Sequence, residues 1–124
     1  QILGVMDRSY DTLEYAYPEL EVISPLLSAN EMATFNWNVS PGTRMVSNQF
    51  WVSKGQTIHV AATASPSSST FWIGIMDGLN NARYVEGTGN LSHGFSITSS
   101  GHYRVFVQNR SSVQINAAGS YYFD

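Results

Sequence analysis

The stretch STFWIGIMDG, residues 69–78, decides the fold of this chain. Every second position in it carries a large apolar side chain: Phe71, Ile73 and Ile75. This period of two predicts a β-strand with one face toward a core. Trp72 and Met76, on the opposite face, are also large and apolar, whereas a face in water would be polar. The stretch therefore predicts a strand that is apolar on both faces, and it leaves open what the second face contacts.

Alternation of the same kind runs through residues 31–124 and predicts about eight or nine short strands separated by turn residues. Within residues 102–109, one face carries Tyr103, Val105 and Val107, and the other carries His102, Arg104 and Phe106. No helical period occurs in this part of the chain. The sequence therefore predicts an all-β fold, an antiparallel two-sheet β-sandwich of jelly-roll type.

Charge divides the chain into two parts. Residues 1–31 contain six acidic side chains and one basic side chain, whereas residues 32–124 contain three acidic and five basic ones. We therefore expect an acidic N-terminal arm over residues 1–30 and a β-sandwich domain over residues 31–124. Opposite charges would draw the arm onto its own domain or onto a neighbouring molecule, and the second case would give a homo-oligomer through the arm.

The bulk composition excludes several classes of partner. A length of 124 residues predicts a single domain. The net charge of −3 offers no positive surface to nucleic acid, and no apolar run approaches the ~20 residues of a membrane span. Cysteine is absent, and uncharged polar residues are abundant, as is common in secreted β-proteins. We expect a secreted, extracellular protein whose leader has been removed.

Catalytic and metal-binding patterns are weak. A serine-type triad could combine one of the three histidines, His59, His93 or His102, with Asp77 or Glu86, but no spacing favours it. Asp77 and Glu86 could also face each other across a hairpin, as glycosidase carboxylates do across a sugar. The run from Asp77 to Asn81 contains oxygen ligands for calcium, although a hairpin turn explains the same residues. We expect neither an enzyme nor a cofactor, with a structural calcium as the alternative.

The outward face of the predicted strands is the candidate ligand-binding site. If the core residues point inward, one mixed aromatic and polar set points outward: Trp51, Trp72, Met76, His102, Arg104 and Phe106. Such a face could stack sugars on its rings, or it could be covered by the arm or by a partner subunit. A β-bulge would instead shift the register and reverse the two faces. The sequence leaves these alternatives open.

The chain from about residue 31 to residue 123 resembles a known group of proteins, and the acidic arm has no match in it. The residues that carry this resemblance are Phe50, Gly55, Ile58, Val60, Ile73, Gly74, Ile75, Phe95, Ile97, Gly101, Tyr103, Val105, Val107, Asn109, Ser111, Val113, Ile115, Gly119 and Tyr121. Their pattern is similar to that of small exported β-sandwich proteins of Gram-positive bacteria, the bacilli and clostridia, and of accessory sandwich domains of secreted hydrolases. The resemblance implies an exported, non-catalytic module and carries over no active-site residue.

Together these observations predict a secreted, non-catalytic interaction or assembly module. Its outward aromatic face would be covered by its own arm or by a partner subunit. The alternative is a carbohydrate- or cell-wall-binding module that stacks sugars on Trp51, Trp72 and Phe106. The partner at this face is accordingly a protein or a glycan.

Overall fold

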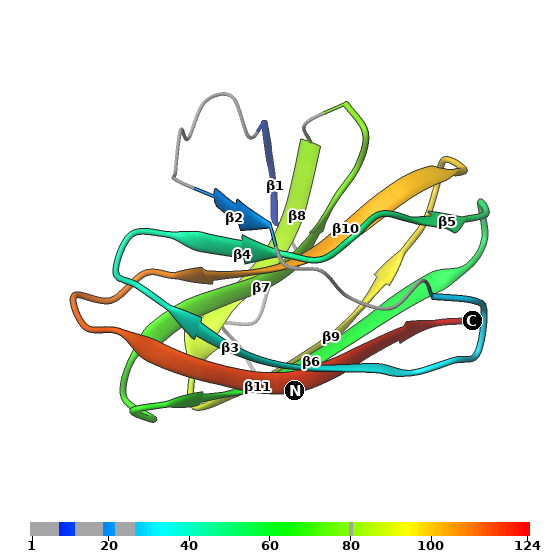
Figure 1. Ribbon diagram of the computed structural model, residues 1–124. Coiled ribbons are helices and arrows are strands. Elements are labelled where there is room, and N and C mark those ends of the chain that lie inside the picture. Colours follow the sequence, from blue (N-terminus) through cyan, green and yellow to red (C-terminus); the bar gives the residue numbers. More distant parts are fainter. Residues whose placement is uncertain (1–7, 12–18, 22–26, 80) are drawn as a thin grey trace.

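The protein is a β-sandwich of two sheets that pack face to face (Figure 1). The computed structural model describes residues 8–11, 19–21, 27–79 and 81–124, and within these ranges all regular structure is β-strand. The all-β, two-sheet architecture predicted from the sequence is confirmed.

The larger sheet has seven strands in the order β1-β8-β7-β10-β4-β2, and β5 pairs with the first part of β10. These strands are β1 (Arg8–Asp11), β2 (Glu19–Glu21), β4 (Arg44–Val46), β5 (Phe50–Val52), β7 (Thr70–Met76), β8 (Asn81–Thr88) and β10 (Gly101–Asn109). Neighbours are antiparallel except β2, which runs parallel to β4.

The smaller sheet has the order β3-β11-β6-β9, and all its pairings are antiparallel. Its strands are β3 (Ala33–Val39), β6 (Thr57–Ser65), β9 (Asn90–Ser96) and β11 (Ile115–Phe123). If β4 and β5 are taken as one interrupted strand, the eight strands from β3 onward form two sheets of four in the order of a jelly roll. Successive strands change sheet except β7 and β8, which pair with each other in the larger sheet.

The core lies between the two sheets and consists of the residues that alternate inward. Phe71, Ile73 and Ile75 are at most 2% exposed and belong to this core, as the opening stretch predicts. On the other sheet, β3 shows a strict buried-exposed alternation from Ala33 to Val39. The core is thus built by the period-two pattern, which was readable without knowledge of the strand order.

A buried asparagine connects three parts of the sandwich. Asn109 is fully buried, and its Nδ2 donates to the carbonyl oxygens of Val39 (2.9 Å) and Val113 (2.7 Å). Its Oδ1 accepts from the backbone N–H and the hydroxyl of Ser111 (2.8 and 2.7 Å). This side chain therefore fixes the turn between β10 and β11 against the end of β3, because a buried amide must be paired.

Strand β4 was not predicted. Arg44, one of the five basic residues among residues 32–124, is only 1% exposed, and its guanidinium carbon lies 5.8 Å from the centre of the Phe106 ring. Between β4 and β5, Ser47 continues the ladder in an irregular way. Its N–H donates to the carbonyl of Val105, and its hydroxyl accepts from the Val105 N–H (2.8 and 2.9 Å).

Two described strands fall within the predicted arm of residues 1–30. β1 pairs with β8 and β2 pairs with β4, so both belong to the larger sheet of the same chain. The remaining parts of the arm, residues 1–7, 12–18 and 22–26, lie outside the described residues. In the part of the chain that is described, no helix is long and apolar enough to cross a membrane.

Candidate binding faces

Half of the predicted site residues lie in a second apolar cluster on the outer face of the larger sheet. This outer cluster consists of Val46, Trp72, Met76, Ala82, Tyr84 and Phe106. All six are buried, with Phe106 fully so and Trp72 6% exposed. Of the alternatives that the sequence left open for this face, the burial agrees with a covered face and not with an exposed ligand platform at Trp72, Met76 and Phe106. Val46, Ala82 and Tyr84 are members that the sequence analysis missed.

Trp72 is held by contacts on three sides. Its indole ring stacks on Tyr84, with centroids 3.8 Å apart and planes at 21°. Its Nε1–H donates to Oε2 of Glu86 (2.9 Å), and the guanidinium carbon of Arg110 lies 4.7 Å from the ring centre. These contacts combine a stacked pair, a hydrogen bond to a carboxylate and a cation–π interaction. The ring is thus fixed and buried, and it offers no open face on which a sugar could stack.

Gly74 explains how the outer cluster closes. It is paired with Phe106 on one side and Tyr84 on the other. A Cβ at this position would lie 2.8 Å from Cε2 and Cζ of Phe106 and 2.2 Å from the carbonyl oxygen of Arg83. The missing side chain therefore makes room for the Phe106 ring between Trp72 and Met76.

The other three predicted site residues lie outside this cluster. Trp51 is 54% exposed and makes an edge-to-face contact with His102, 5.2 Å between centroids. His102 is exposed and Arg104 is half-buried. The six residues therefore do not form one surface. The prediction that Trp72 and Phe106 serve as exposed stacking platforms is wrong, because both rings are buried, and Trp51 is the exposed member of that trio.

Near Trp51, loops form a cavity of about 300 Å³. This loop-end cavity is lined by Gln49, Asp77, Gly78, Leu79, Ser99, Ser100, Gly101, His102 and Tyr103. The hydroxyl of Tyr103 donates to the carbonyl of Ser99 (2.5 Å). Burial raises the pKa of Tyr103, the Asp77 carboxylate raises it further, and the Arg83 guanidinium partly opposes both.

The two carboxylates that were considered for chemistry have other partners. Asp77 Oδ1 accepts from the backbone N–H groups of Leu79 and Asn81 (2.8 and 2.9 Å), so Asp77 closes the hairpin turn. Glu86 accepts a hydrogen bond from Trp72, the residue with which it is paired across β7 and β8. Asp77 lies five residues after Trp72, so the backbone positions of Asp77 and Glu86 are about 17 Å apart along the strands. They are too far apart to flank one glycosidic bond. Within the described ranges, no three His, Asp or Glu side chains are grouped to hold a metal ion.

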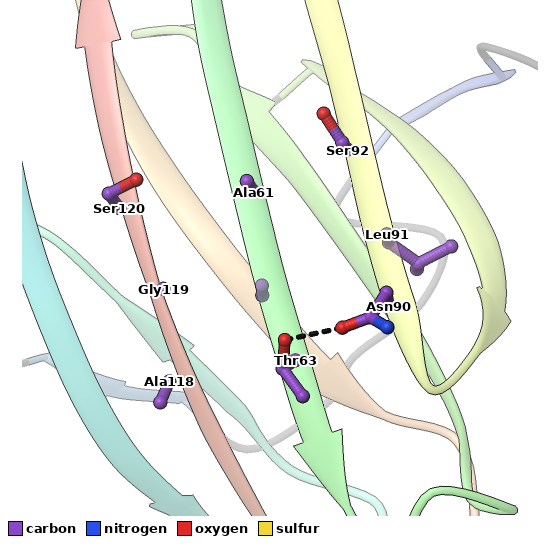
Figure 2. A pocket seen from close by; sticks show the side chains of 9 residues that line it. Ala61, Thr63, Asn90, Leu91, Ser92, Ala118, Gly119 and Ser120 are labelled. Carbon is purple, nitrogen blue, oxygen red and sulfur yellow. Dashed lines mark hydrogen bonds between the residues drawn. The ribbon is translucent and has the colours of Figure 1, made fainter.

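The structure also places a groove where the sequence analysis predicted none, on the outer face of the smaller sheet (Figure 2). This sheet groove has a volume of about 420 Å³ and is lined by Ala61, Ala62, Thr63, Asn90, Leu91, Ser92, Ala118, Gly119 and Ser120. The small outward side chains of three adjacent strands make its floor. The signal in the sequence was the recurrence of Ala, Gly and Ser in residues 61–64 and 117–120, but it required the knowledge that β6 and β11 are neighbours.

The groove continues into a second pocket of about 150 Å³, because both are lined by Ala61, Ser92 and Ser120. In this His59 pocket, the imidazole of His59 stacks on Tyr122 at 4.5 Å and 14°. His59 Nε2 lies 2.9 Å from Oδ1 of Asp124, within hydrogen-bonding distance. His93 also lines the pocket.

Comparison with known proteins defines the chain by its fold. Neither a protein-family model nor a curated protein matches the sequence. The structure is similar to PliG of Aeromonas hydrophila, a periplasmic lysozyme inhibitor of g-type lysozyme, with a TM-score of 0.59, 15% identity, and 86% of this chain and 98% of that chain covered. A PliG variant from Escherichia coli gives a TM-score of 0.56, 13% identity, and coverage of 86% and 99%.

An accessory domain of a hydrolase also occurs among the matched structures. It is the pre-peptidase C-terminal domain of collagenase from Bacillus anthracis, with a TM-score of 0.45, 12% identity, and coverage of 87% and 96%. A likeness of this size carries no argument about function. At identities of 15% and below, the PliG likeness shows the fold alone.

Proposed function

We propose that this chain is a non-catalytic binding module of an exported protein, from a Gram-positive bacterium as the sequence resemblance implies. In this proposal its N-terminal arm closes the outer cluster within the same chain. The observation that carries the proposal is the burial of a six-residue apolar cluster on a sheet face against which none of the described strands forms a further sheet. Strands β1 and β2 lie at the two sides of that face.

The spacing of these strands supports closure by the chain itself. Four strands separate β1 from β2, so the two lie about 24 Å apart at ~4.8 Å per strand. Eight peptide steps join Asp11 to Glu19, and they can span at most about 29 Å. Both edges of the larger sheet are thus formed by strands of the arm of the same chain. We therefore assign the cover to the arm rather than to a partner subunit.

Charge supports the same assignment. Arg44 and Arg110 lie beside rings of the outer cluster, and Arg104 points outward from the same sheet. The first 31 residues carry six acidic groups and one basic group. Attraction between an acidic arm and this basic face favours an intramolecular cover, and salt would weaken it.

A truncation tests this proposal. A variant that lacks residues 1–24 should lose several degrees of melting temperature, or should dimerise through the exposed cluster, because a large exposed apolar patch favours association. Differential scanning calorimetry and size-exclusion chromatography measure the two outcomes. A variant that lacks only residues 1–7 keeps β1 and β2 and is the matched control. An unchanged melting temperature together with an unchanged elution volume in the longer truncation would show that the arm does not close this face.

Exposed apolar side chains favour a protein partner as a second candidate. Trp51 and Leu79 are 54% and 79% exposed. Leu79 lines the loop-end cavity, and so does His102, whose ring contacts Trp51. Exposed aromatic side chains are frequent anchors of protein interfaces. Since the similar PliG structures are inhibitors of g-type lysozyme, that enzyme is the first partner to assay. Inhibition that is lost in Trp51→Ser would support this candidate, and absence of inhibition by the full chain would remove lysozyme as the partner.

A further inference from the structure

We propose that the sheet groove binds an uncharged oligosaccharide chain, with the His59 pocket at one end of the site. This inference rests on the proposed function of a binding module and names its ligand class. It places the ligand on the smaller sheet, opposite the face from which the sequence analysis expected sugar binding.

The shape of the groove suits a ligand that lies along the sheet. Outward positions of β6 and β11 carry small side chains at the centre: Ala61, Ala118 and Ser120. Larger outward side chains, His59 and Tyr122, stand at one end. The groove volume of about 420 Å³ lies within the ~300–1,000 Å³ of typical ligand sites. Because the side chains of this floor are short, a chain-like ligand could contact the groove along its whole length.

The charge of this face selects an uncharged ligand. The outward positions of β3, β6, β9 and β11, four strands that are described in full, carry no Lys, Arg, Asp or Glu: Thr34, Asn36, Asn38, Thr57, His59, Ala61, Thr63, Ser65, Asn90, Ser92, Gly94, Ser96, Asn116, Ala118, Ser120 and Tyr122. Asp124, the residue after β11, is engaged with His59. A phosphorylated, sulfated or nucleic-acid ligand would leave its charges without counterparts on such a face.

The stacked pair in the His59 pocket supplies a flat surface. His59 lies parallel to Tyr122, and Asp124 holds the imidazole from its Nε2 side. The side chain of His59 is 35% exposed, so part of the ring remains accessible. A flat ring that is fixed at one end of a groove can contact the face of a sugar ring that carries C–H groups, and it loses little entropy on binding because it is already held.

Polar groups at the rest of the face match hydroxyl groups. The Thr63 hydroxyl bonds to the side chain of Asn90 across β6 and β9 (2.5 Å), as Figure 2 shows. Farther along, Asn116 Nδ2 donates to the side-chain oxygens of Asn36 and Asn38 (2.6 and 3.1 Å). Amides and hydroxyls both donate and accept, as sugar hydroxyls do. A purely apolar ligand would instead leave these groups desolvated.

Isothermal titration calorimetry of the full chain tests the proposal. The probes are four soluble oligosaccharides: cellohexaose, xylohexaose and hexa-N-acetylchitohexaose, which are uncharged, and hexagalacturonate, which is charged. Ala61 lines both the groove and the His59 pocket, so Ala61→Arg would obstruct the site without entering the core. Ser96→Arg adds the same side chain on the same face outside the groove and is the matched control. If Ala61→Arg unfolds, Ala118→Arg carries the same test.

The expected result is binding of at least one uncharged probe and weaker or no binding of the charged one. Ala61→Arg should then lower the affinity by at least about tenfold, and Ser96→Arg by less than about twofold. His59→Ala should lower it several-fold, whereas His59→Phe should retain most of it, because a flat ring is kept over Tyr122.

Three results would overturn the proposal. They are no binding of any uncharged probe to the folded chain, equal affinity in Ala61→Arg, and preferred binding of hexagalacturonate. None of them bears on the closure of the outer cluster by the arm, which lies on the other sheet and is tested by truncation. Conversely, if removal of residues 1–24 changes neither the melting temperature nor the elution volume, closure by the arm is refuted, and binding in the sheet groove is still decided by the titrations.

Discussion

A single methyl group at Gly74 tests the packing of the outer cluster. In Gly74→Ala the new Cβ would lie 2.2 Å from the Arg83 carbonyl oxygen and 2.8 Å from two carbons of the Phe106 ring. Since real Cβ contacts do not fall below 3.0 Å, β7 and β8 would have to move apart by about 0.8 Å. Phe106 is fully buried, so its ring has no space into which it can turn.

The structure gives the size of this effect. Overpacking of a buried site costs about 1–3 kcal/mol, and here a backbone atom is involved, so we expect the upper end, about 3 kcal/mol. In a chain of this length the melting temperature should fall by about 10 °C. Urea unfolding followed by circular dichroism measures the free energy of unfolding directly.

The matched control is Gly78→Ala. A Cβ at Gly78 meets nothing within 4 Å, so this variant should stay within about 0.5 kcal/mol of the parent. If Gly74→Ala is as stable as Gly78→Ala, then the Phe106 ring does not occupy the space above Gly74, and our description of the outer cluster is incorrect.

Three further substitutions test particular contacts. Glu86→Ala should cost about 1–2 kcal/mol in urea unfolding, because it removes the acceptor of the buried Trp72 N–H, whereas Glu86→Gln should cost less than about 0.5 kcal/mol; equal losses would contradict the role of that bond. Asn109→Ala should lower the free energy of unfolding by about 3 kcal/mol, because it removes the donor to the carbonyls of Val39 and Val113. Asn109→Asp should lower it by a similar amount, because a carboxylate cannot donate to these carbonyls. An Asn109→Asp variant as stable as the parent would refute the role given to these two hydrogen bonds. Because the pKa of Tyr103 is raised on folding, its contribution to stability is present below about pH 10 and is lost as the pH rises through the raised pKa. Tyr103→Phe should therefore lose less stability between pH 9 and pH 11 than the parent does, and equal losses would contradict it.

Prediction from the sequence succeeded where a local period determines the structure. The alternation at residues 71–76 assigned Phe71 and Ile73 to the core and Trp72 and Met76 to the opposite face, and the structure bears out both assignments. Each of these assignments depends on the side-chain period of a strand, which does not require knowledge of its neighbours.

Features that depend on strand order could not be predicted in this way. Tyr84 joins Trp72 because β8 lies beside β7, and Arg44 reaches Phe106 because β4 lies beside β10. The sheet groove likewise forms because small residues of β6, β9 and β11 become neighbours. The alternative with Trp72 and Phe106 exposed failed for a related reason, since the sequence indicated which face they occupy and left open what covers it.

The central claim is that the outer cluster is closed within one chain, and the environment of Trp72 tests it most directly. The chain has three tryptophans, so a variant with Trp37→Phe and Trp51→Phe reports Trp72 alone. Acrylamide quenching of its fluorescence should be weak and should not change with protein concentration. In the same variant without residues 1–24, the emission should shift to the red and quenching should become strong. Efficient quenching in the full chain, or protection that grows with protein concentration, would contradict closure by the chain's own arm.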